Sequence, residues 1–486
     1  MTALYGQNIL RVVPELRYST KKDDRLDLAF FVNGIPVATV ELKTNFAQSL
    51  PAAIAQYKRD RHPQGEPLLT AGRGALVHFA LTQDDIAMTT RLVGDATTFL
   101  PFNRGNDGGA GNPPNGEKPR TAYFWEDVLD RDAWLQILTK FVYTNHEKQT
   151  DPLTGKVTYR SQIRFPRFHQ WRAVTALAAA ARADGTGHRY LIQHSAGSGK
   201  TDSIAWTAHR LAALHTPAGD KVFDSVFVIA DRQVLDRQLQ DAVDQLVTAT
   251  GTFQAITRGS EGSKTAQLTE ALASGVPIIG VTLQTFPHAL QQIREKGGTL
   301  SGKRFAVIAD EAHSSQSGAA AGKLKELLYL GERVDIDDDE PGADQDALVA
   351  MAAHADSARR LSFFAFTATP KAKTLELFGT RAPDGTPRPF DLYSMKQAIE
   401  EGFILDVLRG YTTYDMAARI AKRAADADEG AHDDGDEIDV RKGTRAFIGL
   451  VELHPTNITS KVSEILTHYR EVVQPCLLYT SPSPRD

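Results

Sequence analysis

Short apolar runs dominate the hydrophobic pattern of this chain. Near the N-terminus, the runs 26–32 and 37–43 flank Asn33-Gly34, a pair typical of the tight turn between two antiparallel strands. From residue 166 on, apolar runs of strand length alternate with stretches of helical periodicity. These runs are 190–192, 226–230, 277–281, 305–309 and 361–366. The alternation predicts an α/β fold with a mostly parallel sheet covered by helices on both faces.

A glycine-rich turn follows the first of these later strands. The stretch Gly197-Ser198-Gly199-Lys200-Thr201 stands between the run 190–192 and a helix-like segment. Glycines let backbone N–H groups curl around phosphates, and a helix N-terminus adds partial positive charge. Lys200 supplies a point charge, and the Thr201 hydroxyl can ligate Mg²⁺. The stretch predicts a phosphate-binding loop for ATP, although His194 stands where the usual pattern begins with glycine.

The tetrapeptide Asp310-Glu311-Ala312-His313 follows another apolar strand and predicts the second half of the same site. We expect Asp310 to hold Mg²⁺, and Glu311 to position and deprotonate the hydrolytic water. His313 would pass the nucleotide state to Thr367-Ala368-Thr369, which follows the run 361–366. Gln170, ahead of the phosphate loop, suits a residue that reads the adenine edge. All these motifs follow strands of a parallel sheet, where such sheets bind their ligands.

Carboxylates and a lysine gather in the N-terminal hairpin. Glu41 and Lys43 are two residues apart on a strand, so their side chains share one face. Together with Asp27 on the preceding strand, they resemble the site of PD-(D/E)xK nucleases. In such a site two carboxylates hold Mg²⁺ and a lysine orients the attacking water. Gln56 and the basic cluster 58–61 follow on a helix-like stretch; the alternatives are a solvated strand face and an exposed helix end.

The nuclease interpretation constrains the hairpin. A plain two-residue Asn33-Gly34 turn sets Asp27 opposite Val40, so Asp27 and Glu41 would point to opposite faces of the sheet. Catalysis therefore predicts an odd-length loop or a β-bulge near Gly34. With it, the two carboxylates would lie close enough to share one metal ion.

Composition narrows the class of protein. The 42% apolar and 24% charged residues are ordinary for a globular protein, and no apolar run is long enough to cross a membrane. The first residues lack an apolar signal core, so we expect a cytoplasmic protein with no membrane partner. The single cysteine, Cys476, excludes a disulfide framework and a thiolate metal site. A net charge of −5 gives no argument for nucleic-acid binding.

With both sites identified, the chain resembles the motor and cleavage (R) subunit of type I restriction-modification enzymes, over residues 1 to about 475. The stretches that carry the resemblance are 27–43, 194–201, 310–318 and 398–408. The resemblance implies that Asp27, Glu41 and Lys43 form an endonuclease site and that the later motifs belong to a superfamily-2 ATPase using ATP and Mg²⁺. The implied DNA-tracking and coupling motifs are Asp231-Arg232, Thr282-Leu283-Gln284 and Thr367-Ala368-Thr369.

The same resemblance implies an activity and partners. The protein would translocate double-stranded DNA with ATP and cut unmodified DNA within a complex that contains methyltransferase and specificity subunits. It would hold DNA mainly through phosphates, and its binding would weaken steeply with salt. Two rivals are a DEAH-type repair or remodelling motor with a degenerate nuclease domain, and a non-catalytic DNA-binding fragment.

The predicted domains follow from the resemblance. They are a PD-(D/E)xK endonuclease domain (1–145), a linker (146–165), a first RecA-like domain (166–388), the truncated start of a second RecA-like domain (389–475) and an artefactual tail (476–486). The stretch 103–120 is predicted to be a long loop, and the acidic runs 332–346 and 424–439 are predicted to be solvated.

Two departures from the family matter. Members often carry a tyrosine four residues after the nuclease-helix glutamine, and here Asp60 holds that place. Residues 476–486 resemble a translated sequencing adapter, which implies that the second motor domain is cut short. The arginines that such a domain contributes to ATP hydrolysis would then be missing, so we expect this chain to bind nucleotide but to hydrolyse it negligibly.

Overall fold

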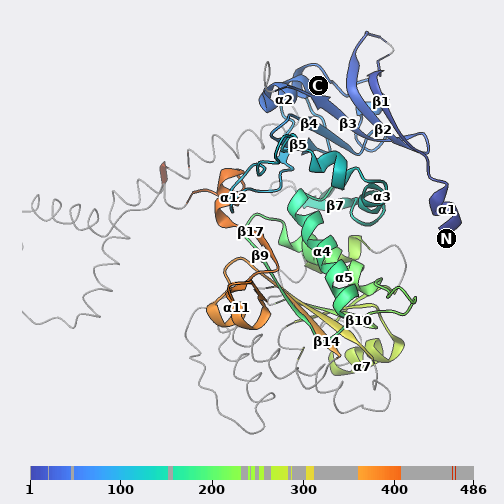
Figure 1. The fold of residues 1–486 in the computed structure, drawn as a ribbon. Helices are drawn as coiled ribbons and strands as arrows, with labels where there is room; N and C mark the ends of the chain where they lie inside the picture. Colours follow the sequence, from blue (N-terminus) through green and yellow to red (C-terminus); the bar gives the residue numbers. More distant parts are fainter. Residues whose placement is uncertain are drawn as a thin grey trace, which may run out of the picture. The chain divides into compact units, whose positions relative to one another are not determined.

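The computed structural model (Figure 1) describes residues 2–19, 21–44, 49–150, 157–230, 239–240, 242–246, 251–256, 264–282, 286, 303–310, 360–406, 462–463 and 466. The chain divides into two compact units, Met1–Phe403 and Ile404–Asp486. The elements below all belong to the first unit. Within the described ranges, no helix combines the length and the apolar character needed to span a bilayer.

The N-terminal part forms a mixed sheet. In the described residues its strands are β1 (Leu10–Arg17), β2 (Arg25–Val32), β3 (Ile35–Leu42), β4 (Val77–Leu81), β5 (Ile86–Thr89) and β6 (Leu100–Pro101), in this order across the sheet. Neighbours are antiparallel except β3 and β4, which are parallel. A parallel pair needs a crossover connection, and α2 (Leu50–Arg59) and the turn η1 (Pro67–Leu69) lie between β3 and β4. The short helix α1 (Thr2–Gly6) precedes β1.

The expected β-bulge is present in the hairpin. Asn33 and Gly34 both have positive φ (52° and 82°), the conformation of a tight two-residue turn, and Val32 pairs with Ile35. The register then shifts, because Phe31 pairs with Pro36 but Phe30 pairs with Ala38. The extra residue, three positions after Gly34, reverses the alternation of β3 relative to β2. Leu28 therefore pairs with Val40, and the next position along sets Asp27 against Glu41.

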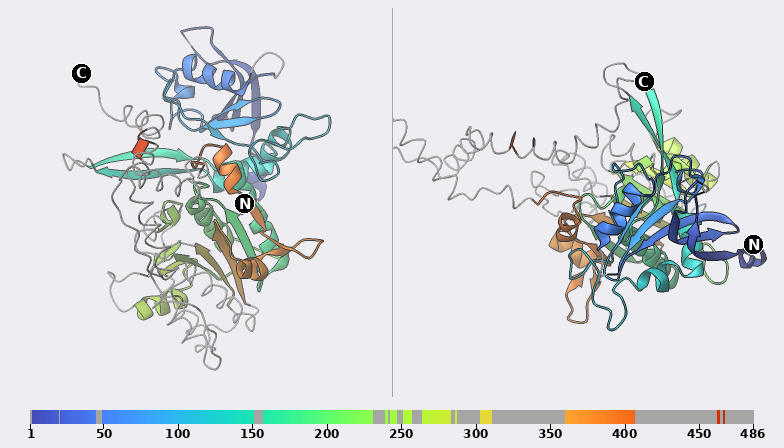
Figure 2. Two further views of the ribbon diagram at one scale, coloured as in Figure 1. Left: turned by 90° about the vertical axis from the view of Figure 1, so that its left-hand side faces the viewer. Right: turned by 90° about the horizontal axis from the view of Figure 1, so that it is seen from above.

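The segment between the mixed sheet and the later sheet differs from its prediction. The apolar periodicity of residues 125–143 predicts a single helix. The structure has instead the π-helical turn η2 (Phe124–Val128) followed by α3 (Arg131–Lys140). Asp130 separates them, because its carboxylate accepts hydrogen bonds from the first N–H groups of α3. The predicted linker 146–165 is wrong: β7 (Tyr143–Thr150) and β8 (Val157–Arg164) form an antiparallel hairpin, seen as a long ribbon in Figure 2. Its polar strands lack the apolar alternation that sequence patterns reveal.

The second sheet confirms the predicted parallel α/β fold. In the described residues its order is β11 (Phe253–Ala255), β12 (Ile278–Thr282), β10 (Ser225–Ala230), β13 (Phe305–Asp310), β14 (Leu361–Thr367), β9 (Arg189–His194) and β17 (Asp391–Tyr393). Each neighbouring pair is parallel. Side chains of α4 (Phe168–Asp184) and α5 (Lys200–Ala212) pack into one apolar core of this sheet. Those of α7 (Lys264–Ser274) and α11 (Ala372–Phe378) pack into another, and the small pair β15 (Thr380–Arg381) and β16 (Pro387–Arg388) follows.

The boundary predicted at 388/389 is displaced. β17 pairs with β9 inside the parallel sheet, and the following α12 (Met395–Glu400) belongs to the same compact unit, which ends at Phe403. Residues 389–403 therefore complete the part of this unit that holds the parallel sheet instead of starting a further one. The sequence favoured the other assignment because the run from 390 on is apolar enough to begin a new core. The predicted remainder 407–461, both acidic runs and the tail 476–486 lie outside the described residues.

One apolar core joins the mixed sheet to the helices α4 and α5. It contains Phe79 of β4 together with Phe168 of α4 and Trp206 of α5. Trp206 is 1% exposed, and its Nε1–H donates to the carbonyl oxygen of Phe141 at 2.9 Å. Burying a large ring and satisfying its one polar group together stabilise the contact.

We expect Trp206→Phe to lower the free energy of unfolding by about 1–3 kcal/mol, because it opens a small cavity and leaves the buried Phe141 carbonyl without its donor. Urea denaturation followed by circular dichroism measures the change. The matched control is Trp125→Phe, at a ring that is 45% exposed, which should change the stability by less than about 0.5 kcal/mol. Equal effects of the two substitutions would contradict this account of the core.

Candidate functional site

The phosphate loop links β9 to α5 in the predicted way. Gly197 and Gly199 both have positive φ (72° and 74°), so the loop needs glycine at both positions, and Gly199 caps the helix that begins at Lys200. Lys200 Nζ donates to the backbone oxygen of His194 at 3.2 Å, which closes the loop on itself. Thr201 occupies the second position of the helix. The glycine turn thus leads directly into the positive N-terminal end of α5, the arrangement that binds phosphate.

Gln170 holds the phosphate loop through hydrogen bonds to the loop backbone. Its Nε2 donates to the carbonyl oxygens of Ser198 and Gly199 at 3.2 and 3.0 Å, and its Oε1 accepts from the N–H of Arg167. The side chain is 3% exposed. A Cβ added to Gly199 would stand 2.5 Å from this amide, a second reason for glycine there. The sequence missed this loop-holding role, and reading of adenine by Gln170 stays a prediction.

Two buried ionic groups hold the loop from the side of β17. Asp391 accepts from His194 Nε2 at 2.8 Å and from both Nε and Nη2 of Arg172, at 2.8 and 3.0 Å. Burial lowers the pKa of His194, so its ring is neutral at neutral pH. Burial alone would raise the pKa of Asp391, but the bonds from His194 and Arg172 hold it below its usual value. The ionised Asp391 therefore fixes the residue that replaces the first glycine of the loop.

A second group centres on Arg167. Its guanidinium donates to the carbonyl oxygen of Gly197 at 3.0 Å and to the hydroxyl of Tyr393 at 2.6 Å. Glu401 lies 3.5 Å away, and it also accepts from the Tyr393 hydroxyl. The guanidinium stacks over the ring of Phe403 at 3.6 Å. The partners Tyr393, Glu401 and Phe403 all come from the segment 391–403, and the sequence did not reveal that this segment contacts the phosphate loop.

The other predicted motor residues lie at the same edge of the sheet where they are described. Asp310 ends β13 and pairs with Phe366, while Thr367 ends β14 and pairs with Gln193 just before the phosphate loop. Thr282 ends β12, and Thr369 donates its N–H to the Thr367 hydroxyl after Ala368. Because the strands are parallel, all these positions face one carboxyl edge. Asp231, Arg232, Gln284, Glu311 and His313 lie outside the described residues.

The loop fits a nucleotide phosphate group. Its exposed residues are Ala196, Gly197 and Gly199. The hydroxyls of Ser195 and Ser198 are buried, and no described residue forms a hydrogen bond with either of them. A cationic Lys200 and a helix N-terminus complement a charged ligand. The residues present can hold ATP, with Thr201 and Asp310 on the side where Mg²⁺ would be bound.

The mixed sheet brings the three predicted nuclease residues together. Asp27 Oδ2 accepts the backbone N–H of Leu42 at 2.6 Å and lies 3.9 Å from Lys43 Nζ. Glu41 lies on β3 opposite Asp27 of β2, and the charge of Asp27 acts on the Glu41 carboxylate. The Asp27 and Lys43 side chains are 28% and 15% exposed, whereas Glu41 is fully buried. The bulge in β3 thus places the partly exposed Asp27 and Lys43 beside the buried Glu41.

Arg61 completes this site, and the sequence identified it only as part of a basic cluster. Its Nε donates to Glu41 Oε1 at 2.7 Å, and its Nη2 donates to the carbonyl oxygen of Arg25 at 2.6 Å. Its guanidinium also lies over the ring of Tyr18, 5.7 Å from the centroid. Arg61 is 7% exposed, so it is not a solvated helix end. Gln56 lies half-buried on α2, and the next residue, Tyr57, is buried and bonds to Thr39 of β3.

The remaining oxygen of Glu41 suits a cation. Oε2 is buried, and none of the described residues donates a hydrogen bond to it. Burial raises the pKa of Glu41 to about 7, although Arg61 and Lys43 act in the opposite direction. A buried carboxylate oxygen without a donor is costly unless a proton or a metal ion reaches it. Among the described residues no group of three or more His, Cys, Asp or Glu side chains could hold a metal, so a cation here would have two carboxylates as protein side-chain ligands.

Two family models match this chain. Residues 169–437, more than half of the chain, match the SWI2/SNF2 ATPase family. Residues 4–95 match the type I restriction enzyme R protein N terminus. The first match contains the phosphate loop, and the second contains Asp27, Glu41, Lys43 and Arg61.

Curated relatives agree with both matches. The type I restriction enzyme HindI endonuclease subunit of Haemophilus influenzae is 23% identical over 455 residues, which cover 87% of this chain and 36% of that protein. An endonuclease subunit assigned to the type I restriction enzyme MjaVIIIP of Methanocaldococcus jannaschii is 22% identical over 346 residues, covering 66% and 30%. The chain thus spans about a third of the length of these relatives.

Solved structures give weaker similarity. The fragment structure of an HsdR subunit assigned to a type I restriction enzyme of Vibrio vulnificus has a TM-score of 0.30 and 13% identity, over 94% of this chain and 72% of that one. The structure of T4 UvsW has a TM-score of 0.28 and 12% identity, over 51% and 38%. The assignment rests on the sequence matches, which confirm the resemblance to type I R subunits. The chain therefore belongs to the SWI2/SNF2 ATPase family and begins with the N-terminal region of a type I restriction enzyme R protein.

Proposed function

We propose that this chain is the N-terminal part of an R subunit that uses ATP to translocate double-stranded DNA and cuts unmodified DNA with Mg²⁺. The observation that carries the proposal is the bulge in β3, which places Asp27 and Glu41 on one face in a chain that also contains the ATPase loop. A repair motor with a degenerate nuclease domain would not need this arrangement. Partners of the complete protein would be the methyltransferase and specificity subunits.

The ATPase half works through positioning and charge. Lys200 exchanges its contact with the His194 carbonyl for the phosphates of the nucleotide. Thr201 and Asp310 would hold Mg²⁺, which would neutralise phosphate charge, and Glu311 would orient the attacking water. Arg167 and Gln170 keep the loop backbone in the binding conformation, since both bond to its carbonyl oxygens.

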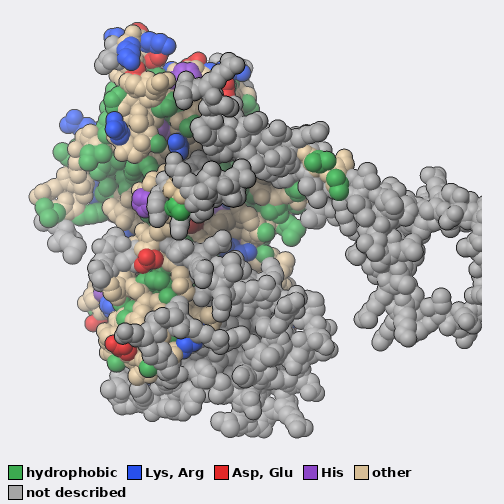
Figure 3. All heavy atoms as spheres, turned by 180° about the vertical axis from the view of Figure 1, so that it is seen from behind, with side chains coloured by type: hydrophobic (Ala, Val, Ile, Leu, Met, Phe, Trp, Pro, Cys, Tyr) green, Lys and Arg blue, Asp and Glu red, His purple; other side chains and the backbone are tan. Residues whose placement is uncertain are grey.

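The nuclease half needs Asp27, Glu41 Oε2 and Lys43. Bound Mg²⁺ would activate water and stabilise charge at the scissile phosphate. Lys43 orients that water and compensates developing negative charge. Arg61 holds Oε1 of Glu41, so the second oxygen is the one directed to the cation. On the face shown in Figure 3, acidic and basic side chains of the described residues are interspersed, so the coloured part of this face gives no argument for a broad basic surface.

The full-length gene product, assembled with its partner subunits, tests the proposal. Unmodified plasmid should be cut only when ATP and Mg²⁺ are both present. Methylated plasmid should stay intact. Cleavage that needs no ATP, or no cleavage of any unmodified plasmid by a complex that hydrolyses ATP, would contradict the proposed combination of activities.

Lys200→Ala should weaken binding of ATP by about 10- to 100-fold, because the phosphates lose a charged donor. In the assembled enzyme it should abolish translocation and restriction together. Fluorescence titration with an ATP analogue and the plasmid assay measure the two effects. Lys221→Ala, at an exposed lysine of the same unit, is the matched control and should change neither. A Lys200→Ala enzyme that still restricts would refute the coupling of cutting to the motor.

Lys43→Ala should lower DNA cleavage by about 100-fold or more and leave DNA-stimulated ATP hydrolysis of the assembled enzyme unchanged. The reason is that Lys43 contacts Asp27 at the mixed sheet and lies outside the phosphate loop. Arg59→Ala, an exposed cation on α2, controls for a general loss of positive charge. Loss of ATP hydrolysis together with cleavage would show that Lys43 supports the fold instead of the chemistry.

Without metal, the stability of the chain should depend on pH through Glu41. Its pKa of about 7 in the fold exceeds the ordinary 4.5, so the folded chain keeps a proton that the unfolded chain has lost between these values. Stability is therefore lost as pH rises from about 4.5 to about 7, by up to about 3 kcal/mol. Glu41→Gln lacks this titration. The free energy of unfolding of the variant, relative to that of the unsubstituted chain, should therefore increase from about pH 4.5 to about pH 7 and stay constant at higher pH. Urea denaturation in chelator measures it, and a pH-independent difference would contradict the raised pKa.

A further inference from the structure

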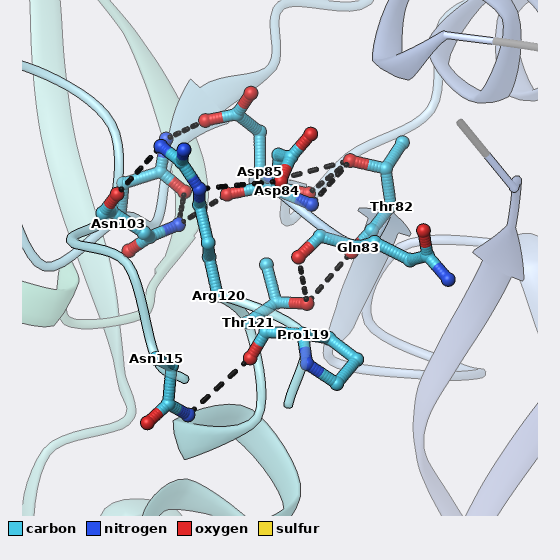
Figure 4. Close-up of polar contacts among 10 residues, drawn as sticks. Thr82, Gln83, Asp84, Asp85, Asn103, Asn115, Pro119, Arg120 and Thr121 are labelled. Atoms are coloured by element: carbon cyan, nitrogen blue, oxygen red, sulfur yellow. Dashed lines mark hydrogen bonds and ion pairs between the residues drawn. The ribbon is translucent and has the colours of Figure 1, made fainter. Parts of the chain in front are cut away.

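The stretch 103–120, predicted as a long loop, is tied to the mixed sheet at its base (Figure 4). Asn103 Oδ1 accepts from the N–H of Ile86, and its Nδ2 donates to Asp85 Oδ1 at 2.9 Å. At the other end of the loop, the Thr121 hydroxyl donates to the carbonyl oxygen of Thr82 at 2.7 Å, and Arg120 lies 3.5 Å from Asp84. Both ends of the loop therefore hold the same turn, 82–85, between β4 and β5.

That turn is adjacent to the candidate nuclease site. It directly follows Leu81, the last residue of β4. The carbonyl oxygen of Leu81 accepts the backbone N–H of Lys43 at 2.9 Å. One residue, Leu81, therefore connects the turn to the backbone of Lys43.

The tip of the loop, residues 104–111, contacts α12, its N-cap residue Ser394 and Arg172 of α4; we call this tip the docking loop. Ala110 donates its N–H to Glu400 Oε2 at 2.7 Å, and the Ser394 hydroxyl donates to the carbonyl oxygen of Gly108. Arg172 Nη1 donates to the carbonyl oxygen of Arg104 at 3.1 Å. Three backbone groups of the docking loop are therefore held by side chains of the ATPase unit.

Two glycines make this close approach possible. A Cβ on Gly109 would stand 2.6 Å from Glu400 Oε2, and a Cβ on Gly105 would stand 2.6 Å from Gln397 Oε1. Gly105 also has a φ of 84°, which favours glycine in any surroundings. At Gly109 a methyl group would push the Glu400 carboxylate, the end of a flexible side chain, away from the N–H of Ala110, so this position tests the docking itself.

From this contact, two short polar routes reach the phosphate loop. In one, Arg172 bonds to both Arg104 and Asp391, and Asp391 holds His194. In the other, α12 leads to Glu401, which contacts Arg167. Arg167 in turn bonds to the carbonyl oxygen of Gly197. Because Asp391, His194 and Arg167 are buried, a shift of one partner leaves a costly unpaired group and is passed on to the next.

We propose that the docking loop couples nucleotide binding at the phosphate loop to the turn 82–85 and thereby to the backbone of Lys43. The inference rests on the proposed function only in taking nucleotide as the ligand of the phosphate loop. Nucleotide that orders this loop stabilises the Arg167 and Asp391 groups, and these hold the docking loop more firmly. By linkage, a loosened docking loop lowers the affinity for nucleotide by the same factor.

Hydrogen exchange of the full chain tests the proposal, with Mg²⁺ and the slowly hydrolysed analogue ATPγS as the probe. Exchange in peptides spanning 103–112 and 82–87 should slow by about fivefold or more on nucleotide binding, the lower end of measured couplings. In Gly109→Ala and in Glu400→Gln the nucleotide effect on both peptides should fall below about twofold, with nucleotide affinity reduced correspondingly. Glu117→Gln, at an exposed acid in the outer part of the same loop, is the matched control and should keep the full effect.

The outcomes separate this inference from the proposed function. A separate titration of nucleotide binding reports on the phosphate loop alone. If nucleotide binds but leaves the exchange of 103–112 unchanged in the unsubstituted chain, the coupling is overturned and the ATPase assignment stands. If Gly109→Ala and Glu400→Gln both fold normally and keep the full nucleotide effect, the docking loop is not the connecting element. No nucleotide binding at all would overturn the proposed function first.

Discussion

The parallel pairing of β17 with β9 holds the phosphate loop at the edge of the second sheet. Tyr393 pairs with His194, and the N–H of Ser195 donates to the Tyr393 carbonyl oxygen at 2.9 Å. This short strand also brings Asp391 next to His194. Without β17, the phosphate loop would have no strand beside it on this side, and Nε2 of the buried His194 would lose Asp391 as its partner. Arg167 at the N-terminus of α4, the phosphate loop and α12 all depend on this pairing.

Buried charge makes the arrangement specific. Arg167, Asp391 and Glu401 are all nearly excluded from water, and each has an opposite charge or a hydrogen-bond donor within reach. Removing one member of such a buried pair costs about 3–5 kcal/mol, because the other charge is left without compensation. Alternative packings of α12 would break several of these pairs at once. The same property gives the segment 391–403 one position relative to the phosphate loop, which is what a coupling element needs.

A different constraint organises the mixed sheet. Side chains alternate with period two along a strand, so a single extra residue in β3 decides whether Asp27 and Glu41 meet. The bulge sets them together, and Arg61 compensates part of the cost of burying Glu41. This geometry leaves Glu41 with a raised pKa and with one oxygen that accepts no hydrogen bond from the described part of the chain. Such strain is expected where a cation is to be bound, and it distinguishes Glu41 from a carboxylate on a solvated strand face.

The sequence by itself determined what local patterns encode. Apolar runs alternating with helical periodicity predicted the parallel sheet, and the glycines of 197–201 predicted the phosphate loop. The requirement that Asp27 and Glu41 lie on one face of the sheet predicted the bulge. The sequence did not predict the β7–β8 hairpin, whose strands are polar, or the place of β17, whose three residues carry no periodic signal. Nor did it pair Arg61 with Glu41, Gln170 with the loop carbonyls, or the stretch 104–111 with α12. Those contacts join residues far apart in the chain, and only tertiary packing, with the need to compensate each buried charge, decides which of them form.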